Sequence, residues 1–415
     1  MTSCCDRHTS GLTSYEVVLA DLLSLARPVA THTQVTLAKA PGQILAQDVV
    51  ARLALPPRDN SAVDGYALGE PNGTNSFKVR SRTAAGEAAS SAPLGLGQAD
   101  RIFTGAPIPP ATFGVGMQED VIVQDGVIAL SVVPSKGAHI REGGEDIQPC
   151  DPLISAGTRL DARHIALLAA MGHAEVRVTS PLQVAIFSSG KELRDPGQDL
   201  GPAAIHDSNR WMLNALLSGM NVEIRDLGIL SDNREKIGRA LADAGVGADL
   251  ILGTGGVSVG EEDHIFAALS DVGTASKQYR MAVKPGKPVV FGPVGRALTI
   301  CLPGNPVAAL VSFGLLVRPC IGALLGRKEN PPSPMPAISG FDWTRKPGRT
   351  EYFPARQIGC SPAGTPILEK LGKGGSALLK PLIHAQGFAR VALDTKQVSV
   401  GDRIDWFPFE PGFSL

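Results

Sequence analysis

Hydrophobic and polar positions follow two different periods along this chain, and the change of period separates its regions. Apolar residues recur at helical spacing in SYEVVLADLLSLA, residues 14–26, and the pattern ends near Arg27 and Pro28. DARHIALLAAMG, residues 161–172, predicts another helix, with Asp161 as its N-cap and Gly172 at its C-terminal end. From about residue 46 to 146, short apolar segments such as FKVR and GVIAL stand among Gly, Pro, Thr and Ser. That pattern predicts a small β-rich domain.

Residues 181–329 alternate between strand and helix patterns. The predicted strands are QVAIFSS, NVEIRDLG, LILGT and RALTICL. The predicted helices begin at the pairs Asp207-Ser208, Ser231-Asp232 and Asn305-Pro306. Such alternation predicts a doubly wound, right-handed α/β sheet with helices on both faces. Ligands in these sheets bind beyond the carboxyl ends of the strands.

The last part of the chain changes pattern again. Four prolines between residues 331 and 336 indicate a linker, and the residues after it form short β segments separated by glycine turns. We therefore expect an N-terminal connecting domain (1–45 plus 147–180), a β-rich domain (46–146), an α/β domain (181–329) and a C-terminal β-barrel domain (330–415). No internal repeat is visible.

Composition narrows the class of protein. The 415 residues are 43% hydrophobic and 19% charged, as in globular proteins, and the formal charge of −1 argues against bulk nucleic-acid binding. The first ten residues, MTSCCDRHTS, are polar, which argues against a secretory signal. The longest apolar stretch, Val307 to Val317, is short for a membrane span and predicts a core helix. The six cysteines have no metal-ligand spacing, which favours reduced structural thiols and a cytoplasmic location.

The segment ADLILGTGGVSVGEED, residues 248–263, carries the clearest chemistry. A buried strand is followed by Gly253, Gly255, Gly256 and Gly260, and a loop without bulky side chains lets backbone amides approach an anion. Glu261, Glu262 and Asp263 then supply hard oxygen ligands, which suit a magnesium ion bridging to a phosphate. The segment predicts a site for a phosphorylated ligand.

Two further loops follow strands of the same predicted sheet. Gly190-Lys191-Glu192-Leu193 places Glu192 after QVAIFSS, and Leu302-Pro303-Gly304-Asn305-Pro306 follows RALTICL. In the second loop Asn305 is placed to cap a helix, and Pro306 suits its first turn. Three strand-end loops on one side of a sheet are a stronger indication of a ligand site than any one of them.

Three other polar segments have more than one interpretation. MAVKPGKP, residues 281–288, offers Lys284 and Lys287 to a bound oxyanion, or forms a solvated hairpin turn. PRDNSAVDGYA, residues 57–67, contains Asp59 and Asp64 and is also compatible with Asx turns. REGGED, residues 141–146, is a charged glycine turn of the kind found in surface loops.

These motifs together resemble one family. DNSAVDGYA, RIFTGAPIP, REGGEDI, IHDSN, GGVSVGEED, VKPGKP and LPGNP occur in the order found in molybdopterin molybdenumtransferases, the MoeA family, and the E domain of gephyrin is similar. GGVSVGE and LPGNP also occur in other molybdopterin-binding-like domains, whereas DNSAVDGYA with REGGED is narrower. The resemblance covers nearly the whole chain.

The resemblance implies both an activity and an assembly. Family members act in molybdenum cofactor biosynthesis: they insert molybdate into adenylylated molybdopterin and release AMP with the help of Mg²⁺. They are homodimers of four-domain subunits, with the active site between subunits and a central molybdopterin-binding-like domain. Molybdopterin adenylyltransferase and apo-molybdoenzymes are the implied partners. Two alternatives remain open: a non-catalytic ligand-binding or scaffold homologue, and a related hydrolase of another nucleotide or pterin substrate.

The resemblance also assigns roles to individual residues. The implied cradle for the pterin phosphate or its adenylate is Gly255, Gly256, Ser258, Gly260, Gly304 and Asn305. The implied metal ligands are Glu192, Asp232 and Asp263, and the implied molybdate pocket is Lys284, Pro303, Pro306, Arg349 and Ser376. Lys287 is a further expected substrate-binding residue. Asp59, Thr104, Arg141 and Asp146 are expected to act from the second subunit.

Two positions depart from the family pattern. Lys191 stands where an acidic residue is usual, and it either pairs with Glu192 and weakens metal binding or faces solvent. Arg280 replaces a lysine and keeps its charge with a different geometry.

Overall fold

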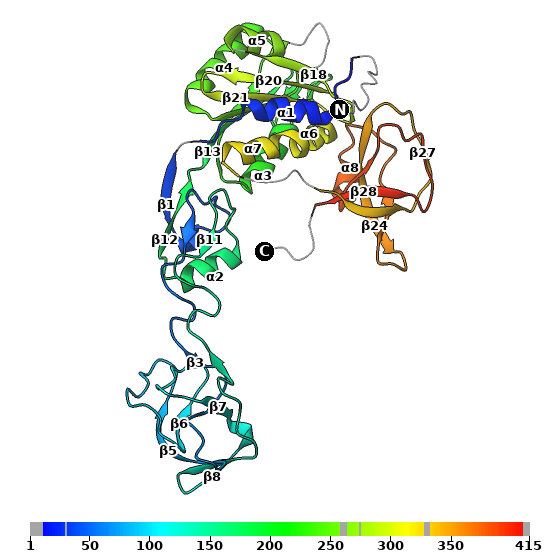
Figure 1. Ribbon diagram of the computed structural model, residues 1–415. Helices are drawn as coiled ribbons and strands as arrows, with labels where there is room; N and C mark the ends of the chain where they lie inside the picture. The colour runs from blue at the N-terminus through cyan, green and yellow to red at the C-terminus, as the bar shows by residue number, and fades with distance from the viewer. Residues whose placement is uncertain (1–10, 30, 258–263, 274, 328–332, 410–415) are drawn as a thin grey trace, which may run out of the picture. The chain divides into compact units, whose positions relative to one another are not determined.

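The computed structural model describes residues 11–29, 31–257, 264–273, 275–327 and 333–409 (Figure 1). The chain divides into two compact units that interleave along the sequence. Unit 1 comprises residues 1–47, 156–165 and 175–415, and unit 2 comprises residues 48–155 and 166–174. This division is coarser than the four predicted domains, whose boundaries stay predictions.

Unit 1 contains a six-stranded mixed sheet in the order β16-β13-β17-β21-β20-β18. Its first four strands are parallel neighbours, while β20 is antiparallel to both β21 and β18. The strands are β13 (Leu182–Ser189), β16 (Val222–Leu230), β17 (Leu250–Thr254), β18 (Lys277–Arg280), β20 (Pro288–Val294) and β21 (Ala297–Leu302). Each of the four predicted strands is present.

Helices cover both faces of this sheet (Figure 1). Strand residues alternate between two cores, so that Val184 and Ile186 pack on one face and Ala185 and Phe187 on the other. The first face carries α1 (Tyr15–Leu25), α3 (Asn209–Ser218), α6 (Pro306–Ser312) and α7 (Arg318–Leu324); the second carries α4 (Arg234–Gly247) and α5 (His264–Val272). The predicted doubly wound α/β architecture is confirmed.

The apolar helix after β21 is longer than the sequence suggested. It continues from α6 through a π-helical segment, Phe313–Val317, into α7, so the pair Arg318-Pro319 lies within it. Residues Pro306–Leu324 are long and apolar enough to cross a membrane, but 67% of that stretch is buried inside the protein. Val307, Val311, Leu316 and Val317 belong to the core of unit 1. The helix thus extends beyond the predicted stretch Val307 to Val317, whereas the expected core position agrees with the structure.

One predicted helix cap is confirmed and another is wrong. Asp161 Oδ1 accepts hydrogen bonds from the N–H groups of Arg163 (3.0 Å) and His164 (3.3 Å), as an N-cap should. The cap of α4, however, is Asn233, whose side chain accepts from Lys236 N–H at 2.9 Å. The Ser231-Asp232 cap was therefore wrong, because Asp232 makes other hydrogen bonds.

Both remaining predicted pairs stand at the start of their helices, but only the pair Asp207-Ser208 supplies a side-chain hydrogen bond to its helix. Asn305 precedes α6, but its side chain makes no capping hydrogen bond within the described structure. At α3, Ser208 makes none either, and the neighbouring Asp207 Oδ1 accepts from Arg210 N–H at 3.2 Å.

The C-terminal part of unit 1 is a closed five-stranded barrel. Its strands follow the order β24-β25-β22-β28-β26, and β26 pairs with β24 to close it. They are β22 (Met335–Ser339), β24 (Thr350–Cys360), β25 (Pro366–Lys370), β26 (Gly387–Val391) and β28 (Arg403–Pro408). The short pair β23 (Trp343–Thr344) and β27 (Gln397–Val398) and the helix α8 (Lys380–His384) complete this part. The predicted C-terminal β-barrel is confirmed.

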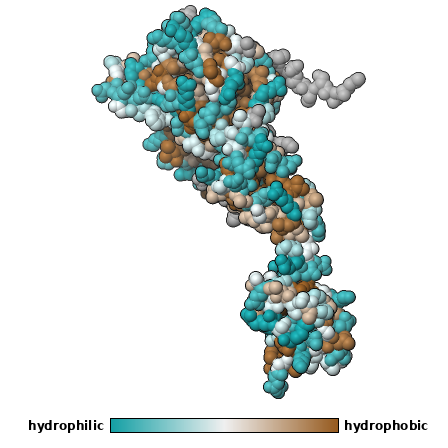
Figure 2. All heavy atoms as spheres, turned by 90° about the vertical axis from the view of Figure 1, so that its left-hand side faces the viewer, coloured by the Kyte–Doolittle hydropathy of each residue, from teal (hydrophilic) through white to brown (hydrophobic). Residues whose placement is uncertain are grey.

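Short elements connect the rest of unit 1. They are the antiparallel pair β1 (His32–Thr36) and β12 (Glu175–Thr179), the 3₁₀ turn at Leu37–Lys39, and the pair β14 (Leu193–Arg194) and β15 (Ile205–His206). Helix α2 (Ala162–Ala170) is divided between the two units after Ile165, and Gly172 follows it at a φ of 77°. On the face drawn in Figure 2, hydrophobic and hydrophilic residues are intermixed.

Unit 2 is β-rich, as predicted. Its six-stranded sheet has the order β7-β4-β6-β5-β9-β8. The strands are β4 (Gly65–Leu68), β5 (Ser76–Thr83), β6 (Gln98–Ile102), β7 (Gly114–Met117), β8 (Val121–Gln124) and β9 (Val127–Leu130), with a 3₁₀ turn at Gln118–Asp120. Two small pairs accompany it: β2 (Val49–Val50) with β11 (Pro152–Ile154), and β3 (Asn60–Ser61) with β10 (Ile140–Arg141).

Candidate active site

A cavity of about 820 Å³ opens at the carboxyl edge of the α/β sheet. Three strand-end loops line it: residues 189, 190 and 192 after β13, residues 255–257 after β17, and residues 303–305 after β21. Because β13, β17 and β21 are parallel neighbours, their carboxyl ends meet at one edge. The structure thus brings together the three loops that the sequence placed after strands.

The opposite wall of the cavity comes from the barrel and from the connection between β18 and β20. Residues 284–288, 349, 351–354 and 374–376 form this wall. Val283 and Lys284 are the two residues of β19, which runs parallel to the start of β24. The cavity is therefore built entirely within unit 1, from segments that are far apart in the sequence.

Two positions in the loop after β17 require glycine. Gly255 has a φ of 90° and Gly256 a φ of 58°, in the region that L-residues rarely adopt. A Cβ at Gly255 would lie 2.1 Å from the carbonyl oxygen of Ser189. The loop therefore packs directly against the end of β13, which closes this side of the cavity.

Asn209 joins two of the strand-end loops. Its Nδ2 donates to Thr254 Oγ1 (2.9 Å) and to the carbonyl of Gly304 (2.7 Å). The Thr254 hydroxyl in turn donates to the carbonyl of Pro303 at 3.2 Å. Asn209 is only 7% exposed, so it ties the loops together beneath the cavity. Sequence analysis gave it no role, although it ends the motif IHDSN.

One side of the cavity carries carboxylates. Asp232 Oδ1 accepts from the Ser189 hydroxyl (2.6 Å) and Oδ2 from the backbone N–H of Lys191 (2.9 Å). Glu192 lies beside it on the loop after β13, and both acidic residues line the cavity. These hydrogen bonds fix the Asp232 carboxylate at the end of the sheet.

The other side carries cations. Lys284, Lys287 and Arg349 line the cavity, and Lys284 Nζ lies 2.9 Å from Glu351 Oε1. Nearby, burial lowers the pKa of Lys370; the neighbouring Glu351 opposes this shift, and the charge of Lys284 adds to it. MAVKPGKP is thus not a solvated hairpin turn, because its strand β19 pairs with the barrel strand β24 and two of its lysines line the cavity.

Most of the predicted substrate-site residues meet in this cavity. Those that line it are Glu192, Asp232, Gly255, Gly256, Lys284, Lys287, Pro303, Gly304, Asn305, Arg349 and Ser376. Pro306 is the first residue of α6, next to the lining residue Asn305. Ser258, Gly260 and Asp263 lie outside the described residues. Among the described residues, no group of three or more His, Cys, Asp or Glu side chains is arranged to hold a metal.

The remaining predicted residues belong to unit 2. Thr104 donates to Asp64 Oδ1 from both its N–H and its hydroxyl, each at 2.8 Å. These bonds, the backbone one first, hold the pKa of Asp64 below its usual value. Asp59 Oδ1 accepts from Gly143 N–H at 2.7 Å, which joins DNSAVDGYA to the REGGED turn.

Arg141 and Asp146 complete that turn. Arg141 pairs with Asn60 between β10 and β3, and the Asp146 N–H donates to the carbonyl of Leu55 at 3.1 Å. All four predicted unit 2 residues thus lie in or beside two hydrogen-bonded loops.

The structure also describes the two residues that depart from the family pattern, Lys191 and Arg280. Lys191 and Arg280 are exposed, and neither is among the residues that line the cavity. The backbone of Lys191 nonetheless supports the site through its bond to Asp232.

Comparison with known proteins agrees with this architecture. The MoeA N-terminal region (domains I and II) matches residues 13–172, the probable molybdopterin-binding domain matches residues 185–323, and the MoeA C-terminal region (domain IV) matches residues 336–409. A molybdopterin molybdenumtransferase of Haemophilus influenzae is 35% identical over 92% of this chain and 95% of its own length. The chain belongs to the molybdopterin molybdenumtransferase (MoeA) family.

Other relatives of the MoeA family extend the match. Molybdopterin molybdenumtransferase 2 of Mycobacterium tuberculosis is 30% identical over 94% of this chain and 97% of its own length. The crystal structure of a molybdopterin biosynthesis MoeA protein from Pyrococcus horikoshii OT3 has a TM-score of 0.81 at 25% identity, covering 96% of this chain and all of the other. Membership of this family makes the chain a transferase of molybdenum cofactor biosynthesis, and the expectation of an enzyme is confirmed.

Proposed function

We propose that the cavity binds adenylylated molybdopterin and molybdate, and that the enzyme inserts molybdenum into the pterin with Mg²⁺-dependent release of AMP. The observation that carries the proposal is that one cavity holds carboxylates and cations from different segments. Glu192 and Asp232 come from the strand-end loops, whereas Lys284, Lys287 and Arg349 come from the β18–β20 connection and the barrel, where Glu351 pairs with Lys284. A nucleotide with its metal suits the acidic side, and a dianion such as molybdate suits the basic side.

The donor set on the acidic side suits magnesium. Mg²⁺ in proteins is commonly held by one or two carboxylates together with substrate phosphates and water. Glu192 and Asp232 provide two such carboxylates, and Asp263 is proposed as a third from the sequence. Bound there, the ion would neutralise the phosphate anhydride and favour loss of AMP.

The residues themselves position the reactants. The glycine loop at Gly255 and Gly256 and the amides near Gly304 are proposed to hold the phosphates, because no side chain keeps an anion away from this backbone. Lys284, Lys287, Arg349 and Ser376 are proposed to hold molybdate by charge and hydrogen bonds. The reaction needs no covalent nucleophile, since positioning and electrostatics supply the activation.

The proposal includes a homodimer whose site takes Asp59, Thr104, Arg141 and Asp146 from the second subunit. These four residues lie in unit 2 and are not among the residues lining the unit 1 cavity. Molybdopterin adenylyltransferase would supply the substrate and apo-molybdoenzymes would take the product, in the cytoplasm. Sedimentation of the purified chain should give the mass of a dimer, and a monomer would refute this part.

The activity is tested by incubating the purified protein with adenylylated molybdopterin, molybdate and Mg²⁺. We expect AMP release and reconstitution of an apo-molybdoenzyme, both abolished by EDTA and restored by Mg²⁺. Asp232→Asn should reduce AMP release more than it reduces binding of the adenylate. Tight binding without AMP release would instead favour a scaffold protein, and AMP release that ignores molybdate would favour a hydrolase.

A further inference from the structure

The wall of the cavity that carries Lys284, Lys287 and Arg349 also contains a buried acidic residue, to which no sequence pattern assigned a role. Glu351, on β24, is 3% exposed. Its Oε1 lies 2.9 Å from Lys284 Nζ, and its Oε2 accepts from Arg345 Nε at 3.0 Å. Both oxygens of one carboxylate are thus engaged by two different cations.

The backbone fixes this arrangement on one side. Lys284 and Glu351 are directly paired residues of the parallel strands β19 and β24. The N–H of Thr350 donates to the carbonyl of Ala282 at 2.8 Å, which holds the two strands in register. The two side chains therefore start from neighbouring positions in one sheet.

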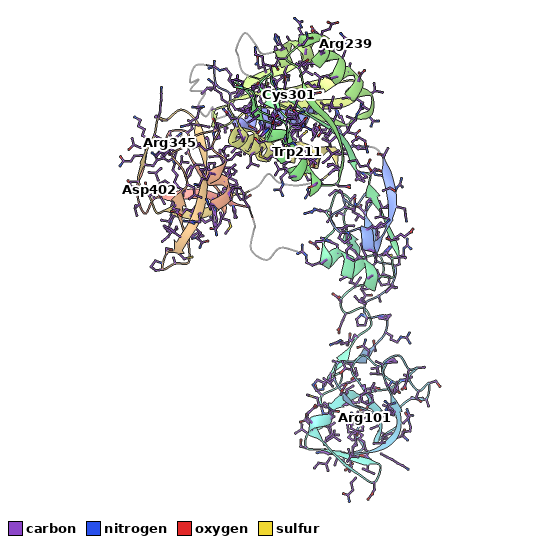
Figure 3. All side chains as sticks on the ribbon, turned by 180° about the vertical axis from the view of Figure 1, so that it is seen from behind. Arg101, Trp211, Arg239, Cys301, Arg345 and Asp402 are labelled. Carbon is purple, nitrogen blue, oxygen red and sulfur yellow. The ribbon has the colours of Figure 1, made fainter. Side chains whose placement is uncertain are left out.

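Arg345, which is labelled in Figure 3, holds the carboxylate from the other side. Its guanidinium donates to the carbonyls of Ala392 (3.0 Å) and Thr395 (2.6 Å), and also to the carbonyl of Arg349. Arg345 is 7% exposed, so with these bonds its side chain is held in one place. Glu351 is consequently a rigid acceptor rather than a mobile surface group.

Lys284 is partly exposed, whereas Glu351 and Arg345 are buried. Its side chain is 44% exposed and lines the cavity, whereas that of Glu351 is 5% exposed. Lysine is a flexible chain carrying a compact charge, so a fixed carboxylate beside its ammonium limits where that charge can go. Because Arg345 also pairs with the carboxylate, Glu351 does not cancel the Lys284 charge that faces the cavity.

We propose that Glu351 is a positioning residue that holds the Lys284 ammonium at the basic wall, where it receives the oxyanion substrate, and that Arg345 anchors Glu351 for this role. The inference rests on the proposed function, since it takes molybdate as the anion bound there. Holding the cation in advance removes an ordering penalty from anion binding. Glu351 itself does not have to touch the substrate.

The experiment is a double-mutant cycle on molybdate binding, measured by calorimetry on the full chain without adenylate. Lys284→Met and Glu351→Gln should each weaken molybdate binding about tenfold, which corresponds to about 1.4 kcal/mol. The double variant should bind no more weakly than Lys284→Met, because Glu351 acts through Lys284. In steady-state assays, Glu351→Gln should raise the KM for molybdate and leave kcat for AMP release nearly unchanged.

Lys287 provides a matched control. It lines the same cavity, so Lys287→Met should also weaken molybdate binding. Because Glu351 does not act through Lys287, the double variant Lys287→Met/Glu351→Gln should lose the product of the two single losses in affinity. If Glu351→Gln is too unstable to purify, Glu351→Asp takes its place in both cycles. It keeps the charge for Arg345 and draws the carboxylate one methylene back from Lys284.

Wild-type molybdate affinity in the Glu351 variants would overturn the inference. It would also be overturned if Glu351→Gln weakened molybdate binding equally in the Lys284→Met and the Lys287→Met proteins. Either result together with intact AMP release would leave the proposed function standing. Coupling of Glu351 to Lys284 in a protein that releases no AMP would support the positioning role and refute the proposed reaction. A wild-type protein that binds no molybdate would overturn both.

Discussion

Replacing Gly255 by alanine should disrupt the end of the α/β sheet. A Cβ there would lie 2.1 Å from the Ser189 carbonyl oxygen, far inside the usual contact distance of about 3.5 Å. The φ of 90° adds a conformational penalty. A left-handed conformation costs a non-glycine residue about 1–2 kcal/mol, and overpacking costs about 1–3 kcal/mol, so we expect a loss of about 2–5 kcal/mol in the free energy of unfolding.

Gly304→Ala is the matched control for this change. Gly304 lines the same cavity, but a Cβ there would have Gly255 Cα as its nearest contact, at an ordinary 3.5 Å. Its φ does not lie in the left-handed region. We expect a change within about 0.5 kcal/mol, as for substitutions that meet no specific obstacle.

Tryptophan fluorescence during urea unfolding measures both variants. The three tryptophans of the chain, Trp211, Trp343 and Trp406, all lie in unit 1, so the signal reports the unit that contains Gly255. With an m value of about 3 kcal/mol per M urea, the midpoint of Gly255→Ala should fall by about 1 M. Equal midpoints for the two alanine variants would refute the argument that backbone proximity requires glycine at 255.

The remaining predictions concern titrating groups. The Tyr279 hydroxyl donates to Asp21 at 2.6 Å, and this hydrogen bond, with burial, raises the pKa of Tyr279 to about 12. A raised pKa contributes stability below the unfolded value of about 10, and this is lost as pH rises to about 12. Urea titrations should therefore show that Tyr279→Phe loses less stability over this interval than the wild type; equal losses would contradict this. Burial raises the pKa of Cys320 to about 12, so iodoacetamide at pH 8 should modify the exposed Cys150 and Cys360 and leave Cys320 unmodified until unit 1 unfolds, as peptide mass spectrometry can check. Labelling of Cys320 at the rate of Cys360 would refute this.

The α/β part of the fold could be predicted because local patterns of apolar and polar residues determine where its strands and helices form. The alternation in residues 181–329 identified the strands β13, β16, β17 and β21, and parallel order placed their carboxyl ends together. The cavity-lining positions of Gly255, Gly304 and Glu192 follow from that order alone. Residues that directly follow strands are predictable because the strand itself determines where they emerge.

Other parts of the site depend on partners that no local pattern specifies. Aspartate is a common N-cap residue, which is why the sequence suggested Asp232 as a cap. In the structure, Ser189 and Lys191 donate hydrogen bonds to its carboxylate, and Asn233 caps α4 instead. Glu351 is a charged residue within a strand, and it acquires its role only when β24 pairs with β19. The only signal in the sequence was a charged residue within a β segment, and the sequence alone shows neither its burial nor its pairing with Lys284.

The packing of α1 against the last helices of the α/β part has a consequence for synthesis of the chain. The Tyr15 hydroxyl donates to the carbonyl of Leu315, 300 residues later, and Val18 and Leu22 are fully buried in the core that also contains Val317. At about 5–20 residues per second, a ribosome needs about 15–60 s to make the intervening chain. During that interval the apolar face of α1 lacks the helices that complete its core, so the nascent protein should be a client of chaperones until most of unit 1 has been translated.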